Sequence, residues 1–153
     1  MKIAILAVGR MKGDPTATLF DAYAARLPWK TTLVEVEDKS KASPAKRREA
    51  ECAKLLAAVP PGALLIALDP RGRSLSSEDF ARAIDRWRSE STKTLAFAIG
   101  GADGFTDDFR ARARVALSFG SMTWPHLLAR VMLAEQLYRA SAILSGHPYH
   151  RGG

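Results

Sequence analysis

The stretch Ala63-Leu64-Leu65-Ile66-Ala67-Leu68 is an unbroken apolar run between two breaks in the chain, Pro60-Pro61-Gly62 and Asp69-Pro70-Arg71-Gly72. A strand that is apolar on both faces is typical of a parallel sheet whose two faces are covered by helices. We therefore predict a buried interior strand over 63–68 that ends in a turn at 69–72.

The segments on either side of this run alternate between strand and helix patterns. Further strands are predicted over 3–8, 32–37, 94–99 and 115–117, and helices beginning near 14, 44, 76, 106 and 125. This alternation predicts an α/β fold with a parallel sheet, in one domain spanning 1–153. Ligands of such sheets bind beyond the carboxyl ends of the strands. The loops after Leu68, Ile99 and Leu117 should therefore meet at one edge.

Composition narrows the class of protein. The 153 residues are 47% hydrophobic and carry a net charge of +7. A basic surface attracts polyanions such as RNA, although an Arg-rich composition alone would give the same charge. A single cysteine, Cys52, excludes an intrachain disulfide and a cysteine zinc site, and we expect it to be a buried apolar residue. The apolar start, 3–9, is short for a signal peptide, and no run is long enough to span a membrane, so we expect a cytoplasmic protein.

Two loops at the predicted edge could hold a ligand. Gly100-Gly101-x-x-Gly104 follows a strand and permits close backbone approach, but it is neither GxGxxG nor a P-loop, and a tight turn is the alternative. Phe119 to Trp124 is a loop of mostly small and polar residues that leads into a helix, whose first amides favour polar or anionic groups. The alternative is an ordinary loop with its N-cap at Thr123.

The last predicted helix and the tail carry the candidates for chemistry. His126 lies in the first turn, where the helix dipole favours a neutral imidazole that could position substrate or accept a proton, or could serve structure alone. Arg130 lies nearer the loop than Arg139 and is the better ligand or substrate candidate. The helix is apolar around most of its circumference, which favours a homodimer. The tail 149–151 offers stacking and phosphate contacts.

Several ordered motifs across the whole chain resemble the RlmH family of SPOUT-class methyltransferases. The motifs are Leu68-Asp69-x-x-Gly72, Ile99-Gly100-Gly101-x-x-Gly104, Thr123-x-Pro125-His126-x-Leu128-x-Arg130-Val131, Glu135-Gln136-x-Tyr138-Arg139-Ala140 and His147-Pro148-Tyr149-His150. Trp124, where the family pattern has an aliphatic residue, is a mild departure.

The resemblance implies a specific fold and reaction. It implies a SPOUT (α/β-knot) fold with a C-terminal trefoil knot, one of the rare exceptions to unknotted topology. It also implies methylation of N3 of a pseudouridine in large-subunit (23S) ribosomal RNA, by a homodimer acting on the assembled ribosome. The methyl donor would be S-adenosylmethionine, with no metal. The implied cofactor contacts are Leu68, Gly100, Gly120, Ser121, Met122, Thr123, Trp124 and Pro125. The catalytic candidates are His126, Arg130, Tyr149 and His150, and solvent could also take the proton.

Three other functions remain open from the residues. A SPOUT enzyme acting on transfer RNA usually has an added recognition domain, which the predicted elements do not provide. A basic domain that serves ribosome assembly would bind RNA without methyl transfer. A metabolite-binding α/β protein would show no affinity for polyanions and no steep salt dependence.

Overall fold

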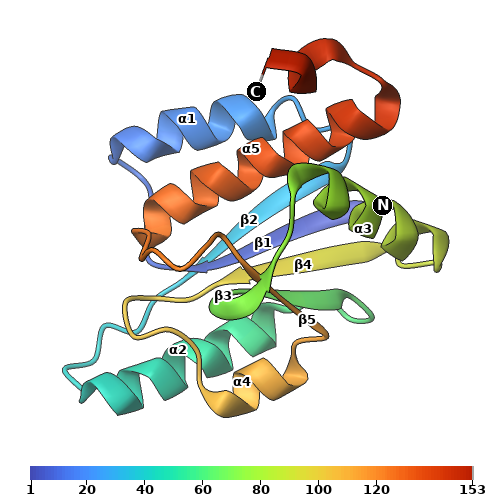
Figure 1. The fold of residues 1–153 in the computed structure, drawn as a ribbon. Helices are drawn as coiled ribbons and strands as arrows, with labels where there is room; N and C mark the ends of the chain where they lie inside the picture. The colour runs from blue at the N-terminus through green and yellow to red at the C-terminus, as the bar shows by residue number, and fades with distance from the viewer. Residues whose placement is uncertain (153) are drawn as a thin grey trace.

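The computed structural model describes residues 1–152, and Gly153 lies outside the described part. Its chain alternates strands and helices (Figure 1). The strands are β1 (Lys2–Val8), β2 (Lys30–Val36), β3 (Leu64–Ser74), β4 (Thr94–Ile99) and β5 (Val115–Ser118). The helices are α1 (Pro15–Ala24), α2 (Pro44–Ala58), α3 (Ser77–Ser89), α4 (Asp107–Arg112) and α5 (His126–Ser145), and a 3-10 helix, η1 (Pro148–Gly152), closes the tail.

The strands form one parallel sheet in the order β2-β1-β4-β3-β5. Helices α1, α3 and α5 cover one face, and α2 and α4 cover the other (Figure 1). The predicted α/β class and parallel sheet are therefore confirmed, and β2 lies at an edge as its alternating pattern indicates. The trefoil knot stays a prediction.

Local sequence signals account for most element boundaries. Ser43, Ser76 and Thr106 each begin a helix, and each side chain accepts a hydrogen bond from a backbone N–H of the first turn. Cys52 lies on the buried side of α2, as expected. Helix α1 ends at Ala24, one turn earlier than the sequence pattern indicates.

The prediction of a turn at 69–72 is wrong. Strand β3 continues through this segment to Ser74, with an irregular stretch between Leu68 and Arg73 where its pairing with β5 changes register. The backbone of Gly72 lies directly against β5. A Cβ at this position would be 2.5 Å from the carbonyl carbon of Ala116. Pairing with a strand distant in sequence therefore overrides the local turn propensity of Asp-Pro-Arg-Gly.

Helix α5 lies between α1 and α3, with the sheet beneath it (Figure 1). Its buried residues include Val131, Leu133 and Leu137, which belong to the core shared with β1, β3 and β4. Packing within one chain thus explains much of the apolar circumference that favoured a second copy. Within residues 1–152, no helix combines the length and apolarity needed to cross a membrane.

Candidate functional site

A cavity of about 520 Å³, here called the edge cavity, opens at the carboxyl edge of the sheet. Its walls come from the irregular middle of β3, from the end of β4 and the loop after it, from the loop after β5 and from the start of α5. Most of the residues that the resemblance implied for cofactor binding line it: Leu68, Gly100, Gly120, Met122, Thr123, Trp124 and Pro125. Ser121 is exposed and is absent from the walls.

The glycine loop after β4 folds tightly because its backbone closes on itself. The N–H of Gly104 donates to the carbonyl of Gly101 at 3.0 Å, and Gly104 has a φ of 71°. A Cβ at Gly100 would be 3.3 Å from the carbonyl carbon of Gly104. Only small residues fit this loop, which leaves its backbone open toward the edge cavity.

The loop after β5 is fixed by its own polar groups. The hydroxyl of Ser118 both donates to the carbonyl of Gly120 and accepts from its N–H, each at 3.0 Å. The indole N–H of Trp124 donates to the carbonyl of Phe119 at 3.2 Å. The N-cap of α5 is Pro125, with no side-chain bond, rather than Thr123. First-turn amides of α5 therefore have no side-chain cap to compete with a polar ligand.

His126, the first residue of α5, lies at the junction of two cavities. It lines the edge cavity and also a second cavity of about 380 Å³, here called the acidic cavity. Its Nε2 lies 3.2 Å from where a Cβ at Gly9 would stand. Burial, and secondarily the positive charge of Arg130, lower the pKa of His126, so the imidazole is neutral near pH 7.

Arg130 is fully buried and absent from the walls of these cavities. One guanidinium nitrogen donates to Glu35 Oε2 at 2.7 Å, and the other donates to the carbonyls of Val8 and Gly9 at 2.8 and 2.9 Å. These contacts join α5 to the ends of β1 and β2, and the role of Arg130 in binding ligand or substrate stays a prediction.

Tyr149 and His150 follow α5 in the chain and fold back onto Glu135 and Arg139, in the middle and second half of that helix. The Tyr149 hydroxyl donates to Glu135 Oε1 at 3.0 Å, and His150 Nε2 lies 2.7 Å from Glu78 Oε1. Burial and hydrogen bonding raise the pKa of Tyr149, whereas the contact with His150 lowers the pKa of Glu78. Glu135 lies nine residues after His126 along α5, roughly 14 Å of rise, so one chain does not bring Tyr149 into contact with His126.

Reasoning from the sequence missed one ion pair at the edge cavity, between Asp69 and Arg110. Asp69 is buried, and its carboxylate accepts from Arg110 Nε at 2.6 Å and from the N–H of Arg71 at 2.8 Å. Both Asp69 and Arg110 line the cavity. An aspartate directly after a buried strand was the available signal, whereas its partner 41 residues away could not be identified from spacing.

The chain matches the family model described as "Predicted SPOUT methyltransferase" over residues 1–150. The chain belongs to the SPOUT methyltransferase family. Proteins named ribosomal RNA large subunit methyltransferase H are similar to this SPOUT methyltransferase over 99% of both chains, with 52% identity in Rhodospirillum centenum and 48% in Paramagnetospirillum magneticum.

A solved structure shares the fold. It is a probable methylase family protein from Haemophilus influenzae, with a TM-score of 0.60 and 14% identity, covering 96% of this chain and 69% of the other. The edge cavity of this SPOUT methyltransferase is therefore the candidate site for methyl transfer, since the predicted contact residues converge there.

Proposed function

We propose that this protein transfers a methyl group from S-adenosylmethionine to N3 of a pseudouridine in large-subunit ribosomal RNA, in the assembled ribosome of the cytoplasm. The observation that carries the proposal is the edge cavity, which is lined by β3, the loops after β4 and β5 and the start of α5, and by all the implied contact residues except Ser121. Full-length relatives named as large-subunit ribosomal RNA methyltransferases support the same reaction.

The chemistry of the edge cavity fits this cofactor. Leu68, Ile99 and Leu117 provide apolar surface for an adenine ring, and the glycine loop leaves backbone groups within reach of a ligand. The uncapped amides at the start of α5 suit a carboxylate. When bound, S-adenosylmethionine supplies a methyl group already activated by its sulfonium.

The residues of the chain must then align the base and take a proton. N3 of the base gains the methyl group and loses its hydrogen, so a proton acceptor assists the reaction. We assign this role to His126, because it lines the edge cavity and its lowered pKa keeps it neutral. Arg130 holds the end of β1 beside it.

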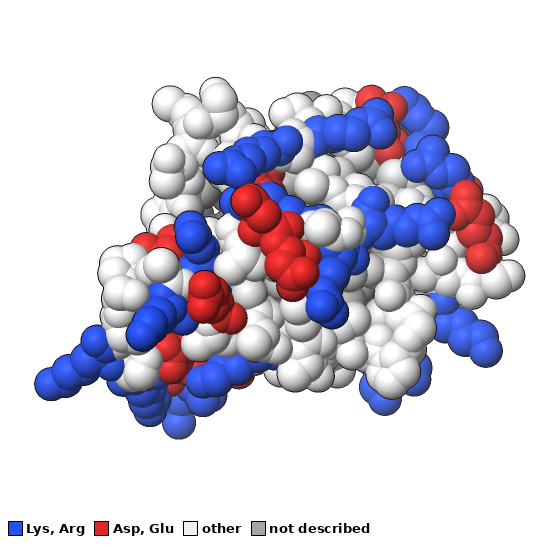
Figure 2. Space-filling view, turned by 90° about the horizontal axis from the view of Figure 1, so that it is seen from below, with Lys and Arg blue, Asp and Glu red and all other residues white. Residues whose placement is uncertain are grey.

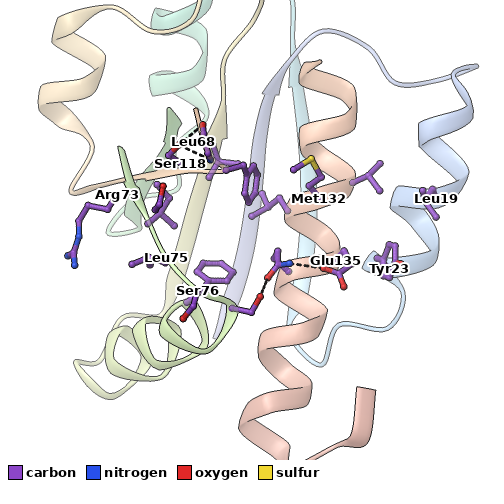
Figure 3. Close-up of a pocket in the computed structure, with 18 residues that line it drawn as sticks. Leu19, Tyr23, Leu68, Arg73, Leu75, Ser76, Ser118, Met132 and Glu135 are labelled. Atoms are coloured by element: carbon purple, nitrogen blue, oxygen red, sulfur yellow. Dashed lines mark hydrogen bonds between the residues drawn. The ribbon is translucent and has the colours of Figure 1, made fainter. Parts of the chain in front are cut away.

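A homodimer would bring the tail to the site. A third cavity of about 540 Å³, the helix cavity, lies among α1, α3, α5 and the β5 loop. Figure 3 shows Leu19 and Tyr23 of α1 and Met132 and Glu135 of α5 along it, opposite Leu75. Leu19 is 48% exposed. Burying this largely apolar surface against a second copy would be favourable, and an antiparallel arrangement would set the partner's η1 near this chain's α5 start.

The opposite face suits RNA. Figure 2 shows the face covered by α2 and α4, over which Lys and Arg side chains are spread with Asp and Glu among them. The cations of these two helices are Lys46, Arg47, Arg48, Lys54, Arg110 and Arg112. Contacts of this kind to phosphates supply affinity without reading sequence, so recognition would come from the shape of the ribosome.

The test is transfer of labelled methyl from S-adenosylmethionine to ribosomes from a strain that lacks this protein. Isolated subunits and free RNA serve as parallel substrates. We expect label in the large-subunit RNA of assembled ribosomes, at one pseudouridine located by fragment mapping. A protein that binds the cofactor yet labels none of these substrates would contradict the proposal and favour the assembly role.

A further inference from the structure

The acidic cavity adjoins the edge cavity through three shared wall residues, Gly101, Ala102 and His126. Its remaining walls come from the end of β1, the segment after β2 and one side of α2, and they are Val8, Gly9, Glu37, Asp38, Lys39, Arg47, Glu51 and Asp103. A group bound there would lie against His126, which also lines the edge cavity.

Glu51 has an unmatched acceptor in this wall. The residue is 7% exposed, and its Oε1 is buried without a hydrogen-bond partner. The carboxylate packs on the glycine loop. A Cβ at Gly101 would lie 2.9 Å from Oε2 and 3.2 Å from Oε1. Burying a carboxylate oxygen without a hydrogen-bond donor lowers the stability of the fold, so the position of Glu51 indicates a role in binding rather than in folding.

The other charges of the cavity are already engaged. Arg47 pairs with Asp103 at 3.2 Å, and Lys39 pairs with Glu37 at 3.7 Å. Asp38 accepts a hydrogen bond from the hydroxyl of Ser40 at 2.7 Å. Glu37 Oε2 has an ion pair with Lys39 but no hydrogen bond, so it and Glu51 Oε1 are both unmatched acceptors, and Glu51 is the one that packs on the glycine loop beside the edge cavity. A surplus of carboxylates repels phosphate and favours a group that presents N–H donors.

A pseudouridine base presents such donors. Its sugar is joined to carbon, so N1 carries a hydrogen that uridine lacks, and N1–H and N3–H flank the same carbonyl. The acidic cavity offers an acceptor for each, since both Glu51 and His126 line it. Val8 lies beside Gly101 and Gly9 lies beside His126, so the end of β1 forms the floor between the two acceptors.

We propose that the acidic cavity receives the target base, with Glu51 accepting the N1–H that distinguishes pseudouridine from uridine and His126 facing N3. This inference rests on the proposed methyl transfer to N3 of a pseudouridine. It adds a base site and makes Glu51 the residue that selects the modified base.

The test compares methyl transfer to ribosomes that carry either pseudouridine or uridine at the target position. The variants are Glu51→Met, which removes the acceptor at similar length, and Glu51→Gln, which keeps an oxygen. Glu49→Gln, an exposed change on the same helix, is the matched control. We expect Glu51→Met to lower kcat/KM on pseudouridine about 10- to 100-fold, to leave the rate on uridine unchanged, and Glu51→Gln to restore part of the loss.

Two further readouts separate selection of the base from a structural role. Glu51 does not line the edge cavity, so cofactor affinity measured by calorimetry should match the wild type in both variants. Burial raises the pKa of Glu51, and the negative charges of Asp103 and Asp38 raise it further. The positive charges of Arg47 and Lys54 act in the opposite direction but do not cancel this rise. A raised carboxyl pKa costs stability as pH rises above it, so Glu51→Met should raise Tm at pH 8.

The outcomes distinguish the two proposals. If wild-type protein labels neither ribosome, the proposed function fails. If wild-type protein labels pseudouridine and Glu51→Met does so with unchanged kcat/KM, or if wild-type protein labels both bases equally, the assignment of Glu51 is overturned while the methyl transfer stands.

Discussion

His126 shows how neighbours decide what a side chain can do. Its position at the first residue of α5 was evident from the sequence, but the contact with Gly9 and the nearby buried Arg130 arise only in the folded chain. Burial, and secondarily the charge of Arg130, lower the pKa of His126 and so keep the imidazole neutral near pH 7, which is the state that can accept a proton.

We predict that the acidic limb of the pH–rate profile follows His126. Because its pKa is lowered from 6.5, activity should persist below that pH and fall only as pH drops through the folded value. His126→Asn should lower kcat about 100-fold or more and abolish the limb. Single-turnover methyl transfer across pH and an NMR titration of the imidazole check this. Near-normal turnover in the variant would leave solvent as the acceptor.

Gly72 matters because it has no side chain. A Cβ there would lie 2.5 Å from the carbonyl carbon of Ala116 and 2.6 Å from the amide nitrogen of Leu117, and backbone cannot move aside as a side chain can. We predict that Gly72→Ala lowers the free energy of unfolding by about 2–3 kcal/mol in urea titrations. Gly62→Ala, which meets open space at a φ of 73°, should cost only about 1 kcal/mol. Equal losses of stability in the two variants would show that the backbone of Gly72 does not pack tightly against β5.

The attachment of α5 to the sheet depends on one buried ion pair. Arg130 bridges Glu35 and two carbonyls at the end of β1, and Glu35 also accepts from the N–H of Met11 at 2.7 Å. Burial opposes ionisation of Glu35, but these hydrogen bonds outweigh it and lower its pKa. The pair therefore stabilises the fold above about pH 4.5, and this contribution is lost as pH falls through the folded pKa.

We predict that Arg130→Met costs about 3–5 kcal/mol, because Glu35 and two carbonyls lose their donor. The matched control is Arg88→Met, which breaks an exposed pair with Asp85 and should change stability by less than about 1 kcal/mol. Urea unfolding at pH 7 and pH 4 measures both, and the difference between the variants should narrow at the lower pH. A loss in Arg130→Met no larger than in the control would contradict the anchoring role.

At the scale of the whole molecule, His126 and the tail residues lie apart along α5 in one chain. The start of α5 carries His126 at the edge cavity, and its middle and second half carry the cluster of Glu135, Arg139, Tyr149 and His150. The helix cavity between α1 and α5 supplies the apolar surface through which two copies could bring His126 and this cluster together.

We predict complementation between subunits. His126→Asn and His150→Ala should each be strongly impaired, because in the proposed homodimer each variant lacks one half of a site formed by two chains. After equal mixing and subunit exchange, half of the dimers carry both variants and one intact site each, so about a quarter of wild-type activity should return. The measurement is labelled methyl transfer by the mixture. No gain over the separate variants, with exchange verified by mass spectrometry, would place both residues in one chain's site or exclude the tail from it.

Much of the architecture followed from the sequence. The alternation of strands and helices along the chain, the parallel sheet, the helix starts near 44, 76 and 106, and the convergence of the loops after β4 and β5 were predicted from periodicity and turn chemistry. These features depend on residues within one or two turns of each other, so local pattern contains the information.

Other features were decided by residues far apart in sequence. The extension of β3 to Ser74 required pairing with β5, and the role of Arg130 required Glu35, 95 positions away. The unmatched acceptor of Glu51 exists only because α2 packs it on Gly101. The sequence by itself determined the helices and strands and the sheet edge at which the loops meet, because helix caps and the spacing of apolar residues are local properties of the chain. Only the tertiary structure decided which charges are buried and what they face, because burial depends on every segment that excludes water.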